Sequence, residues 1–234
     1  MVISEAIILA GGLGTRLRSA VPDLPKCMAP VAGKPFLCYV ITHLQQQGIT
    51  HFIFSLGYKS EVIEEFLQKE FPSLFFKTSI EAEPLGTGGA IKKALEKAKE
   101  KSVLIANGDT LFKIDVPLLT GFHTLSGANC TLSLKPMKNF DRYGVVDVDA
   151  DNTITSFKEK QYFESGCING GMYALHKNKF LDEDLPTKFS FEKDYLEAYY
   201  TKRRMFGLVQ DEYFIDIGIP EDYERAQEEL KSVR

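Results

Sequence analysis

The chain has 234 residues, of which 44% are hydrophobic and 26% are charged, and this is typical of a globular protein long enough for a sizeable core. These fractions exclude a disordered chain, a collagen and a coiled coil. The 28 basic and 32 acidic residues give a formal net charge of −4. Because no run of like charges forms a basic arm, we expect neither a nucleic-acid partner nor a membrane partner.

The N-terminal half alternates predicted strands with predicted helices. Short apolar runs are typical of buried parallel strands, and apolar residues at helical spacing predict the helices between them. In chain order the pattern predicts a strand at 6–10, a helix at 36–47, a strand at 51–56, a helix at 60–71, a strand at 75–80, a helix at 86–100 and a strand at 102–106. This order favours an α/β fold with a mainly parallel sheet and helices on both faces.

The pattern changes in the C-terminal half. It predicts strands at 129–134, 144–148, 168–175 and 213–217, a helix at 193–200 and a final helix from Pro220 through Leu230. The turn-forming residues at 149–152 predict a hairpin. No linker, repeat or low-complexity stretch interrupts the chain. We therefore expect one domain over residues 1–234, with a more antiparallel C-terminal half that shares the core of the first.

The cysteines and histidines carry no metal or catalytic pattern. The four cysteines are irregularly spaced, without a Cys-x-x-Cys pair, so they indicate neither a zinc site nor a disulfide framework and fit a reducing cytosol. The apolar start lacks a basic region and leads into glycines, so we interpret it as a strand and not as a signal peptide. We expect a cytoplasmic protein. The four histidines have no acidic neighbour pattern, and we interpret them as structural or surface residues.

A glycine-rich segment follows the first predicted strand. Residues 9–17 read Leu-Ala-Gly-Gly-Leu-Gly-Thr-Arg-Leu. Glycines let the backbone approach a ligand and direct its N–H groups at phosphate oxygens, and Arg16 adds a planar cation that suits phosphate. Lys26, which follows Pro25, could reach the same triphosphate. Taken singly, the glycines also fit a tight turn, and a lysine after proline also fits an exposed surface.

Two familiar phosphate-binding motifs do not match this segment. The dinucleotide fingerprint requires a third glycine where this chain has Leu17, and the P-loop string Gly-x-x-x-x-Gly-Lys-Ser/Thr is absent from the sequence. A nicotinamide-dependent dehydrogenase is therefore nearly excluded.

Two aspartates follow short apolar runs that are distant in the sequence. Asp109 comes after the predicted strand at 102–106, and Asp216 lies in the predicted strand at 213–217. Ligands of open α/β sheets lie beyond the carboxyl ends of the strands, and Mg²⁺ takes one or two protein carboxylates together with phosphate oxygens. The alternative is that each aspartate caps the next helix, a role for which Asp115, before Pro117, is the better example.

The combined string Gly-Gly-x-Gly-Thr-Arg-Leu followed by Pro-Lys resembles the signature of sugar-1-phosphate nucleotidylyltransferases. These enzymes join a nucleoside triphosphate to a sugar 1-phosphate and release pyrophosphate. The resemblance continues to Asp216 and implies a Rossmann-like fold, Mg²⁺ held by Asp109 and Asp216, and phosphate contacts from Arg16 and Lys26 as the catalytic cations. In the implied in-line displacement the nucleophile is already anionic, so charge neutralisation and alignment suffice without a general base.

The resemblance also implies two sets of binding residues. The nucleotide-binding set is Leu9, Ala10, Gly11, Gly12, Gly14, Thr15, Glu81, Gly86, Thr87, Asn107 and Gly108. The sugar-phosphate set is Gly144, Glu159, Lys160, Asn169 and Gly170. Without the family match, the run Lys158-Glu159-Lys160 would fit an exposed charged surface.

Glu81 bears on the choice of nucleotide. Many thymidylyl and uridylyl members have glutamine at the matching position, whereas a carboxylate only accepts hydrogen bonds. Guanine offers two neighbouring donors, so Glu81 favours GTP. Glutamate also occurs at this position in some uridylyl members, and the side chain could instead face solvent.

Three strings look most like the branch that guanylylates D-glycero-D-manno-heptose 1-phosphate. They are Pro-Lys-Cys-Met-Ala-Pro-Val at 25–31, Asn-Gly-Asp-Thr-Leu-Phe at 107–112 and Ile-Asn-Gly-Gly at 168–171. Two positions depart from the family pattern, because Cys27 stands where most relatives have proline and Phe214 where tryptophan is frequent. Neither change removes a charged group.

Two other functions stay open at this stage. One is a UTP-dependent uridylyltransferase for an aminosugar or muramic-type 1-phosphate, and the other is a non-catalytic sugar-nucleotide sensor. The sensor is disfavoured because such proteins lose charged site residues, whereas Arg16, Lys26, Asp109, Lys160 and Asp216 are all present. The sequence leaves a homo-oligomer open.

Overall fold

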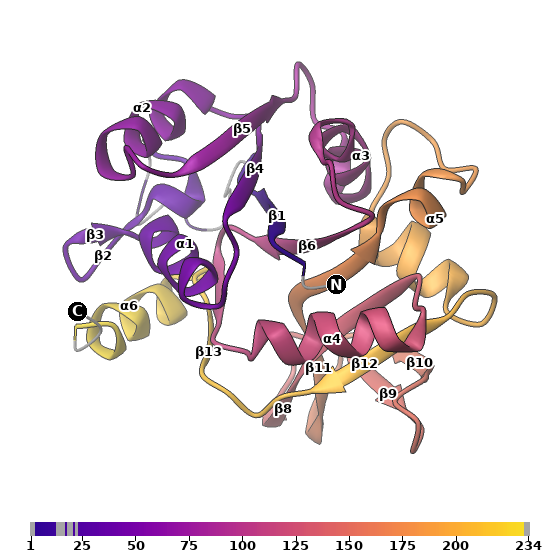
Figure 1. The fold of residues 1–234 in the computed structure, drawn as a ribbon. Coiled ribbons are helices and arrows are strands. Elements are labelled where there is room, and N and C mark those ends of the chain that lie inside the picture. The colour runs from indigo at the N-terminus through magenta and orange to yellow at the C-terminus, as the bar shows by residue number, and fades with distance from the viewer. Residues whose placement is uncertain (1–2, 13–16, 18–20, 22, 232–234) are drawn as a thin grey trace.

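The computed structural model describes residues 3–12, 17, 21 and 23–231. Within this part of the chain, a nine-stranded sheet has the order β10-β9-β11-β6-β1-β4-β5, with β8 paired to β11 and β12 paired to β8 (Figure 1). Its strands are β1 Glu5–Leu9, β4 His51–Leu56, β5 Phe75–Ile80, β6 Ser102–Asn107, β8 Cys130–Phe140, β9 Val145–Val148, β10 Ile154–Lys158, β11 Phe163–His176 and β12 Met205–Val209.

The two halves of the sheet differ in strand direction. β1 pairs in parallel with β4 and β6, and β4 pairs in parallel with β5. β11 pairs antiparallel with β6, β8 and β9, and β9 and β10 form the predicted hairpin. The predicted fold class is therefore confirmed: a mainly parallel N-terminal half continues into a more antiparallel C-terminal half, although β12 joins β8 in parallel.

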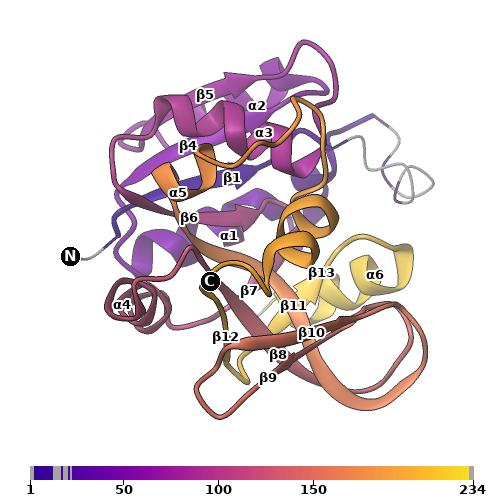
Figure 2. The same cartoon turned by 90° about the vertical axis from the view of Figure 1, so that its right-hand side faces the viewer.

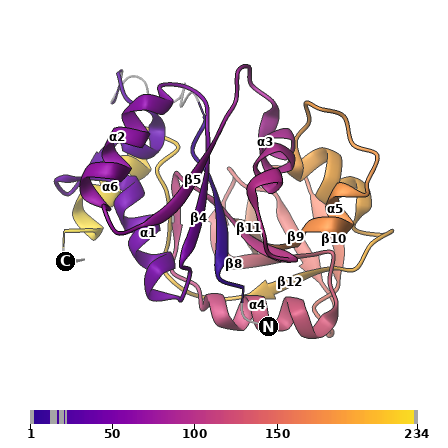
Figure 3. The same ribbon diagram turned by 45° about the horizontal axis from the view of Figure 1, so that its top comes forward.

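Helices cover both faces of the sheet. They are α1 Phe36–Gln46, α2 Ser60–Glu70, α3 Gly86–Ala94, α4 Val116–Ser126, α5 Lys177–Leu181 and α6 Pro220–Glu229, with short helices η2 Lys26–Met28 and η3 Leu95–Lys97 and a π-helix, η4, Phe191–Glu197. Figure 3 shows α1, α2 and α6 on one side of the sheet and α3 and α5 on the other. Among the described residues, no helix is long and apolar enough to cross a membrane.

Alternation along β1 explains these layers. Successive side chains of a strand point to opposite faces. Ala6 and Ile8 therefore pack into the hydrophobic cluster beneath α1 and α2, whereas Ile7 packs into the cluster beneath α3 and η4. All three side chains are fully buried. One continuous sheet thus carries two cores, and both depend on the same strands.

Two small strand pairs lie beside this sheet. β7 Thr110–Phe112 pairs antiparallel with β13 Phe214–Asp216, and β2 Pro30–Val31 pairs with β3 Lys34–Pro35. In the β7–β13 pair, Asp216 lies opposite Thr110. This register brings Asp216 next to the start of β7, which Asp109 directly precedes and which follows the end of β6. Figure 2 shows β7 and β13 side by side.

Several predicted elements have different bounds in the structure, among them the strand predicted at 168–175, which is Phe163–His176. The predicted helix 86–100 ends at Ala94, with a short continuation to Lys97, because Glu5 accepts the backbone N–H groups of Lys99 and Glu100 at 2.8 and 2.9 Å. The strand predicted to end at residue 134 continues to Phe140 along β11. The helix predicted from residue 193 begins at Phe191 and is a π-helix.

Candidate active site

Two cavities meet beyond the carboxyl ends of β1 and β6. The first has a volume of about 610 Å³ and the second about 490 Å³. Both are lined by Thr87, Asn107, Asp109 and Glu192. Ligands of open α/β sheets are expected at this edge, and adjoining cavities allow one molecule to face another across the shared wall.

The first cavity contains most of the predicted nucleotide-binding residues. Its lining includes Leu9, Gly11, Gly12, Glu81, Gly86, Thr87 and Asn107. Ala10 is buried behind this wall, and the Gly108 N–H donates to the Leu9 carbonyl at 2.9 Å, so these two residues support the wall from behind. The predicted Gly14, Thr15 and Arg16 lie outside the described residues.

The glycine at position 11 allows close packing at the base of this cavity. A Cβ at Gly11 would lie 3.0 Å from the Gly57 nitrogen and 3.2 Å from Glu81 Oε1. A side chain at this position would require the neighbouring atoms to move by a few tenths of an ångström, so glycine is the residue that fits here without displacement. The glycine-rich segment therefore brings β1 against the segment that carries Glu81.

Glu81 is half-buried and fixed in orientation. Its Oε2 atom accepts a hydrogen bond from the Leu85 N–H at 2.9 Å, across the turn that leads to Gly86. The carboxylate lies in the cavity wall, so the solvent-facing alternative does not describe this structure.

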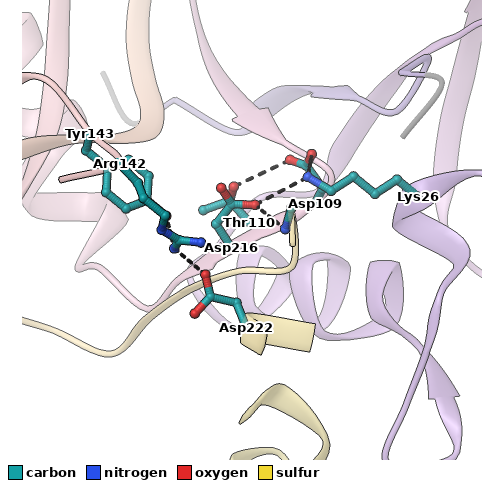
Figure 4. A network of polar contacts seen from close by, with 8 residues as sticks. Lys26, Asp109, Thr110, Arg142, Tyr143, Asp216 and Asp222 are labelled. Carbon is teal, nitrogen blue, oxygen red and sulfur yellow. Dashed lines mark hydrogen bonds and ion pairs between the residues drawn. The ribbon is translucent and has the colours of Figure 1, made fainter. Parts of the chain in front are cut away.

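The centre of the site is an ion-pair network around Lys26 (Figure 4). Lys26 Nζ lies 2.5 Å from Asp109 Oδ2 and 3.3 Å from Asp216 Oδ1. Asp216 Oδ1 also accepts the Gly218 N–H at 2.8 Å. Burial disfavours the charged form of Lys26, but the two carboxylates outweigh burial and raise its pKa.

For Asp216, unlike Lys26, burial determines the direction in which the pKa shifts. Burial raises the pKa of its carboxyl, the neighbouring Lys26 ammonium lowers it, and the negative charge of Asp109 raises it again, with a net increase. Two carboxylates that face one cation at this depth are held together only while positive charge lies between them. The pair is therefore suited to binding a cation.

These carboxylates fit a divalent metal ion. One cation, the Lys26 ammonium, already contacts both Asp109 and Asp216, and carboxylate oxygens are the ligands that Mg²⁺ prefers. The described residues form no group of three or more His, Cys, Asp or Glu that could hold a metal. A Mg²⁺ ion held by two protein carboxylates takes its remaining ligands from phosphate and water.

The second cavity contains most of the predicted sugar-phosphate residues. Gly144, Glu159, Lys160 and Asn169 all line it. The Asn169 amide is fixed, because its Nδ2 donates to the Tyr173 hydroxyl at 2.9 Å and its Oδ1 accepts the Gly171 N–H at 3.0 Å. Gly170 instead packs against Phe112, where any side chain would collide with the ring.

The sequence did not point to several residues that line the second cavity. Glu192 on η4 accepts hydrogen bonds from the hydroxyls of Thr87 at 2.6 Å and Ser190 at 2.9 Å. Lys193 also lines this cavity, as do Tyr143 and Gly171, which lie next to the predicted Gly144 and Gly170 in strings typical of the family. Glu192 and Lys193 stand in no recognisable motif, and only the packing of η4 beside α3 places them here. Gly171 could have been found from its glycine pair with Gly170.

Two histidines and Asp115 have structural roles outside the two cavities, and for these histidines this agrees with the prediction. His123 is buried between the hydroxyls of Ser102 and Thr131, and His176 caps α5 by accepting the Lys179 N–H at 3.3 Å. Asp115 caps α4 by accepting the Leu118 N–H at 2.8 Å, which confirms its interpretation as a cap. The four cysteines are free thiols.

Nearly the whole chain matches one family model. The family model described as nucleotidyl transferase covers residues 5–233. The chain belongs to the nucleotidyl transferase family. Membership makes the protein a nucleotidyltransferase, which confirms the enzyme class that the glycine-rich segment and the two aspartates predicted.

Relatives of this nucleotidyl transferase cover nearly its full length. It is 52% identical over 227 residues to the D-glycero-alpha-D-manno-heptose 1-phosphate guanylyltransferase of Aneurinibacillus thermoaerophilus, with 97% of this chain and 98% of that protein aligned. It is 48% identical over 219 residues to the enzyme of the same name from Campylobacter jejuni, with 94% and 96% aligned. The resemblance to the heptose branch is thereby confirmed.

A solved structure supports the fold of this nucleotidyl transferase. The crystal structure of HddC from Yersinia pseudotuberculosis complexed with GMP-PN has a TM-score of 0.86 and 39% identity to this chain. The alignment covers 98% of this chain and 100% of that one. The mainly parallel sheet flanked by helices is therefore the architecture of HddC as well.

Proposed function

We propose that this protein transfers GMP from GTP to D-glycero-D-manno-heptose 1-phosphate, giving GDP-heptose and pyrophosphate. The observation that carries the proposal is the pair of adjoining cavities that meet at Asp109, next to Lys26 and Asp216. One cavity has the size and glycine-lined wall for a nucleotide, and the other has the polar lining for a sugar phosphate. The two 1-phosphate guanylyltransferases that align over nearly the whole chain support this substrate pair.

The reaction is an in-line displacement at the α-phosphorus of GTP. A phosphate oxygen of the sugar 1-phosphate forms the new P–O bond, the bond to the bridging oxygen of the β-phosphate breaks, and pyrophosphate leaves with that oxygen. The nucleophile is anionic, so no side chain has to remove a proton. The protein accelerates the step by alignment and by charge neutralisation.

Lys26 and the two aspartates supply that neutralisation. In the proposed complex Lys26 contacts the phosphates, and Arg16 in the glycine-rich segment is assigned the same role from the family signature. Asp109 and Asp216 would hold Mg²⁺, which when bound neutralises phosphate charge and orients the triphosphate. The β7–β13 pairing keeps the two aspartates in register for this role.

Glu81 is assigned to the base. Its carboxylate is oriented by the Leu85 N–H, and it can accept from the two neighbouring N–H donors of guanine. HddC complexed with GMP-PN shows that a structural relative binds a guanine-type nucleotide. A UTP-dependent reaction with an aminosugar or muramic-type sugar is the second candidate, which the glutamate at this position still permits.

Glu159, Lys160 and Asn169 are assigned to the sugar phosphate. Lys160 brings a cation for the phosphate, Glu159 accepts from sugar hydroxyls, and the fixed amide of Asn169 adds a directional contact. We also propose one domain over residues 1–234, because both hydrophobic clusters pack on the same sheet. A cytoplasmic site of action agrees with the four free thiols.

Pyrophosphate release tests the proposal. The four ribonucleoside triphosphates and dTTP are each assayed with Mg²⁺ against a panel of sugar 1-phosphates that includes the heptose and mannose compounds. Turnover with GTP and heptose 1-phosphate well above every other pair is expected. Turnover only with UTP or dTTP would overturn the guanine assignment, and a folded protein that binds nucleotide without turnover would favour the sensor.

A further inference from the structure

We propose that Asp222 is a positioning residue for the sugar-phosphate cavity and that it acts through Arg142. The inference rests on the proposed function, since it assigns a role within the same site. Asp222 lies in the first turn of α6, and Arg142 lies in the loop between β8 and β9. Neither side chain is in the lining of the two cavities.

The two side chains form a partly buried ion pair, which Figure 4 shows next to Asp216. Arg142 Nη2 donates to Asp222 Oδ2, and the other oxygen of Asp222 lies 3.1 Å from Arg225 Nη2. The Asp222 side chain is only 12% exposed. The Arg142 side chain is 39% exposed, and its loss would leave the largely buried Asp222 carboxylate with Arg225 as its remaining cation. We therefore expect this contact to hold its loop more firmly than a fully exposed ion pair would.

The loop that Arg142 holds forms part of the cavity wall. Tyr143 and Gly144, which follow Arg142, both line the second cavity. Arg142 Nη2 also donates to the Tyr143 hydroxyl at 3.2 Å, and the Tyr143 ring packs edge-on against Phe214 with 6.2 Å between centroids. Phe214 begins the strand that ends at Asp216. The loop therefore contacts residues on both sides of Asp216 in the sequence, Phe214 before it and Asp222 after it.

Movement of this loop would be transmitted to the residues assigned to the sugar phosphate. At Gly144 the loop lies against the Lys158 carbonyl so closely that any side chain would collide with it. Lys158 directly precedes Glu159 and Lys160. Since packed segments shift together, loosening the Arg142–Asp222 pair displaces the segment that carries both of those residues.

Residues later in α6 form hydrogen bonds with the segment at Pro30 and Ala32. The Tyr223 hydroxyl and Gln227 Nε2 donate to the Pro30 carbonyl at 2.6 and 2.7 Å, and Gln227 Oε1 accepts the Ala32 N–H at 2.9 Å. These contacts support the segment that follows Lys26 and do not involve Asp222. The ion pair therefore positions the wall of the second cavity, which we assign to the sugar phosphate. We expect its loss to weaken binding of the sugar phosphate and not of GTP.

Steady-state kinetics of Asp222→Asn and Arg142→Gln test the inference. Each substitution removes the charge of one partner at nearly constant size. The KM for heptose 1-phosphate is expected to rise about tenfold, the effect of losing one charge-assisted hydrogen bond, while the KM for GTP changes less than about twofold. The double variant is expected to be no worse than either single variant, because both remove the same contact.

Two further variants separate positioning from general stability. Arg225→Gln removes the other partner of Asp222 within α6 and is expected to leave both KM values unchanged. Arg142→Lys keeps a cation in reach of Asp222 and is expected to restore most of the affinity for the sugar phosphate. Equal increases in both KM values, or multiplying effects in the double variant, would overturn the inference.

Hydrogen exchange provides a readout that does not depend on turnover. The amides of residues 141–160 are expected to exchange faster in Asp222→Asn and Arg142→Gln than in the unmodified protein or in Arg225→Gln. Unchanged exchange in this segment would overturn the positioning role, whatever the activity. Absence of turnover in the unmodified protein, with faster exchange in the two variants, would instead contradict the proposed function alone.

Discussion

The ammonium of Lys26 lies 2.5 Å from the carboxylate of Asp109, across 83 residues of sequence. The same ammonium reaches Asp216 at 3.3 Å. One ammonium therefore contacts both of the carboxylates that we assign to the metal. The Lys26 side chain is only 12% exposed. Triphosphate and metal ion would replace these partners together, since the phosphates attract the lysine while the carboxylates take the divalent cation.

Replacing this lysine is expected to change metal binding as well as activity. Lys26→Met keeps most of the length of the side chain and removes its charge. We expect kcat/KM to fall by about 100-fold or more, the effect typical of losing one charge-stabilising group, and the nucleotide-free protein to bind Mn²⁺ more tightly because the carboxylates lose their cation. Electron paramagnetic resonance of free Mn²⁺ measures the second effect.

The control for this change is Lys69→Met, which removes an exposed charge on α2. It is expected to change neither activity nor Mn²⁺ affinity. Weaker or unchanged Mn²⁺ binding in Lys26→Met would contradict the view that the lysine occupies the position of the metal.

Glu81→Gln is expected to change nucleotide preference more than overall rate. A glutamine can donate as well as accept, so it fits a pyrimidine edge better than the paired donors of guanine. The ratio of kcat/KM for GTP to that for UTP is expected to fall about tenfold or more, the discrimination of one or two hydrogen bonds.

Competition assays with both triphosphates measure this ratio. Glu96→Gln, which removes an exposed charge in η3, serves as the control and should leave the ratio unchanged. An equal loss of activity with every triphosphate would show that Glu81 supports the turn at Leu85 and does not read the base.

The parallel half of the fold was predictable because its signals are local. β1, β4, β5 and β6 lie within one residue of the predicted bounds, since buried parallel strands are continuous apolar runs. β12 was not predicted, because its short run contains Gly207 and its partner β8 is distant in sequence. The π-helix was also beyond local patterns, since it depends on the packing of Phe191 and Tyr195 against Phe180.

The residues of the candidate site also fall into those that local sequence patterns predict and those that contacts with distant segments place. Residues in motifs, such as Gly11, Asn107 and Asp109, could be predicted because their spacing carries the chemistry. Glu192 could not, since it reaches the site through a hydrogen bond from Thr87, 105 residues away. Asp222 contacts a loop 80 residues earlier in the chain. No pattern within either segment indicates these partners.

Two glycine substitutions are expected to act in opposite directions. Gly171 has a φ of +74°, and a Cβ there would lie 2.6 Å from Asn107 Nδ2, so Gly171→Ala is expected to destabilise the fold by about 1–2 kcal/mol and to lower activity by displacing an amide that lines both cavities. Gly121 lies within α4, with open space at its Cβ position. Gly121→Ala is expected to stabilise the fold by about 0.5–1 kcal/mol with unchanged activity.

Urea unfolding and the pyrophosphate assay check this pair. A loss of stability in Gly121→Ala would show that the surface of α4 is more constrained than its open surroundings indicate. Full activity in Gly171→Ala would show that the position of Asn107 is not critical for turnover.

The free energy of unfolding is expected to decrease as the pH is lowered below 6.5, because two histidines are buried in the neutral form. Burial lowers the pKa of His43 to about 4, with a further contribution from Lys113, and it lowers the pKa of His123 to about 4, with contributions from His176 and Lys179. The unfolded chain takes up these protons near pH 6.5, whereas the folded chain does not. The stabilisation is therefore fully present above pH 6.5 and is lost as the pH falls from 6.5 towards 4.

Between pH 6.5 and 5.5 each histidine is expected to lower the free energy of unfolding by about 1 kcal/mol, which urea unfolding at several pH values measures. His123→Gln should remove about half of this dependence, and a slope that is the same in that variant would assign the effect to other groups.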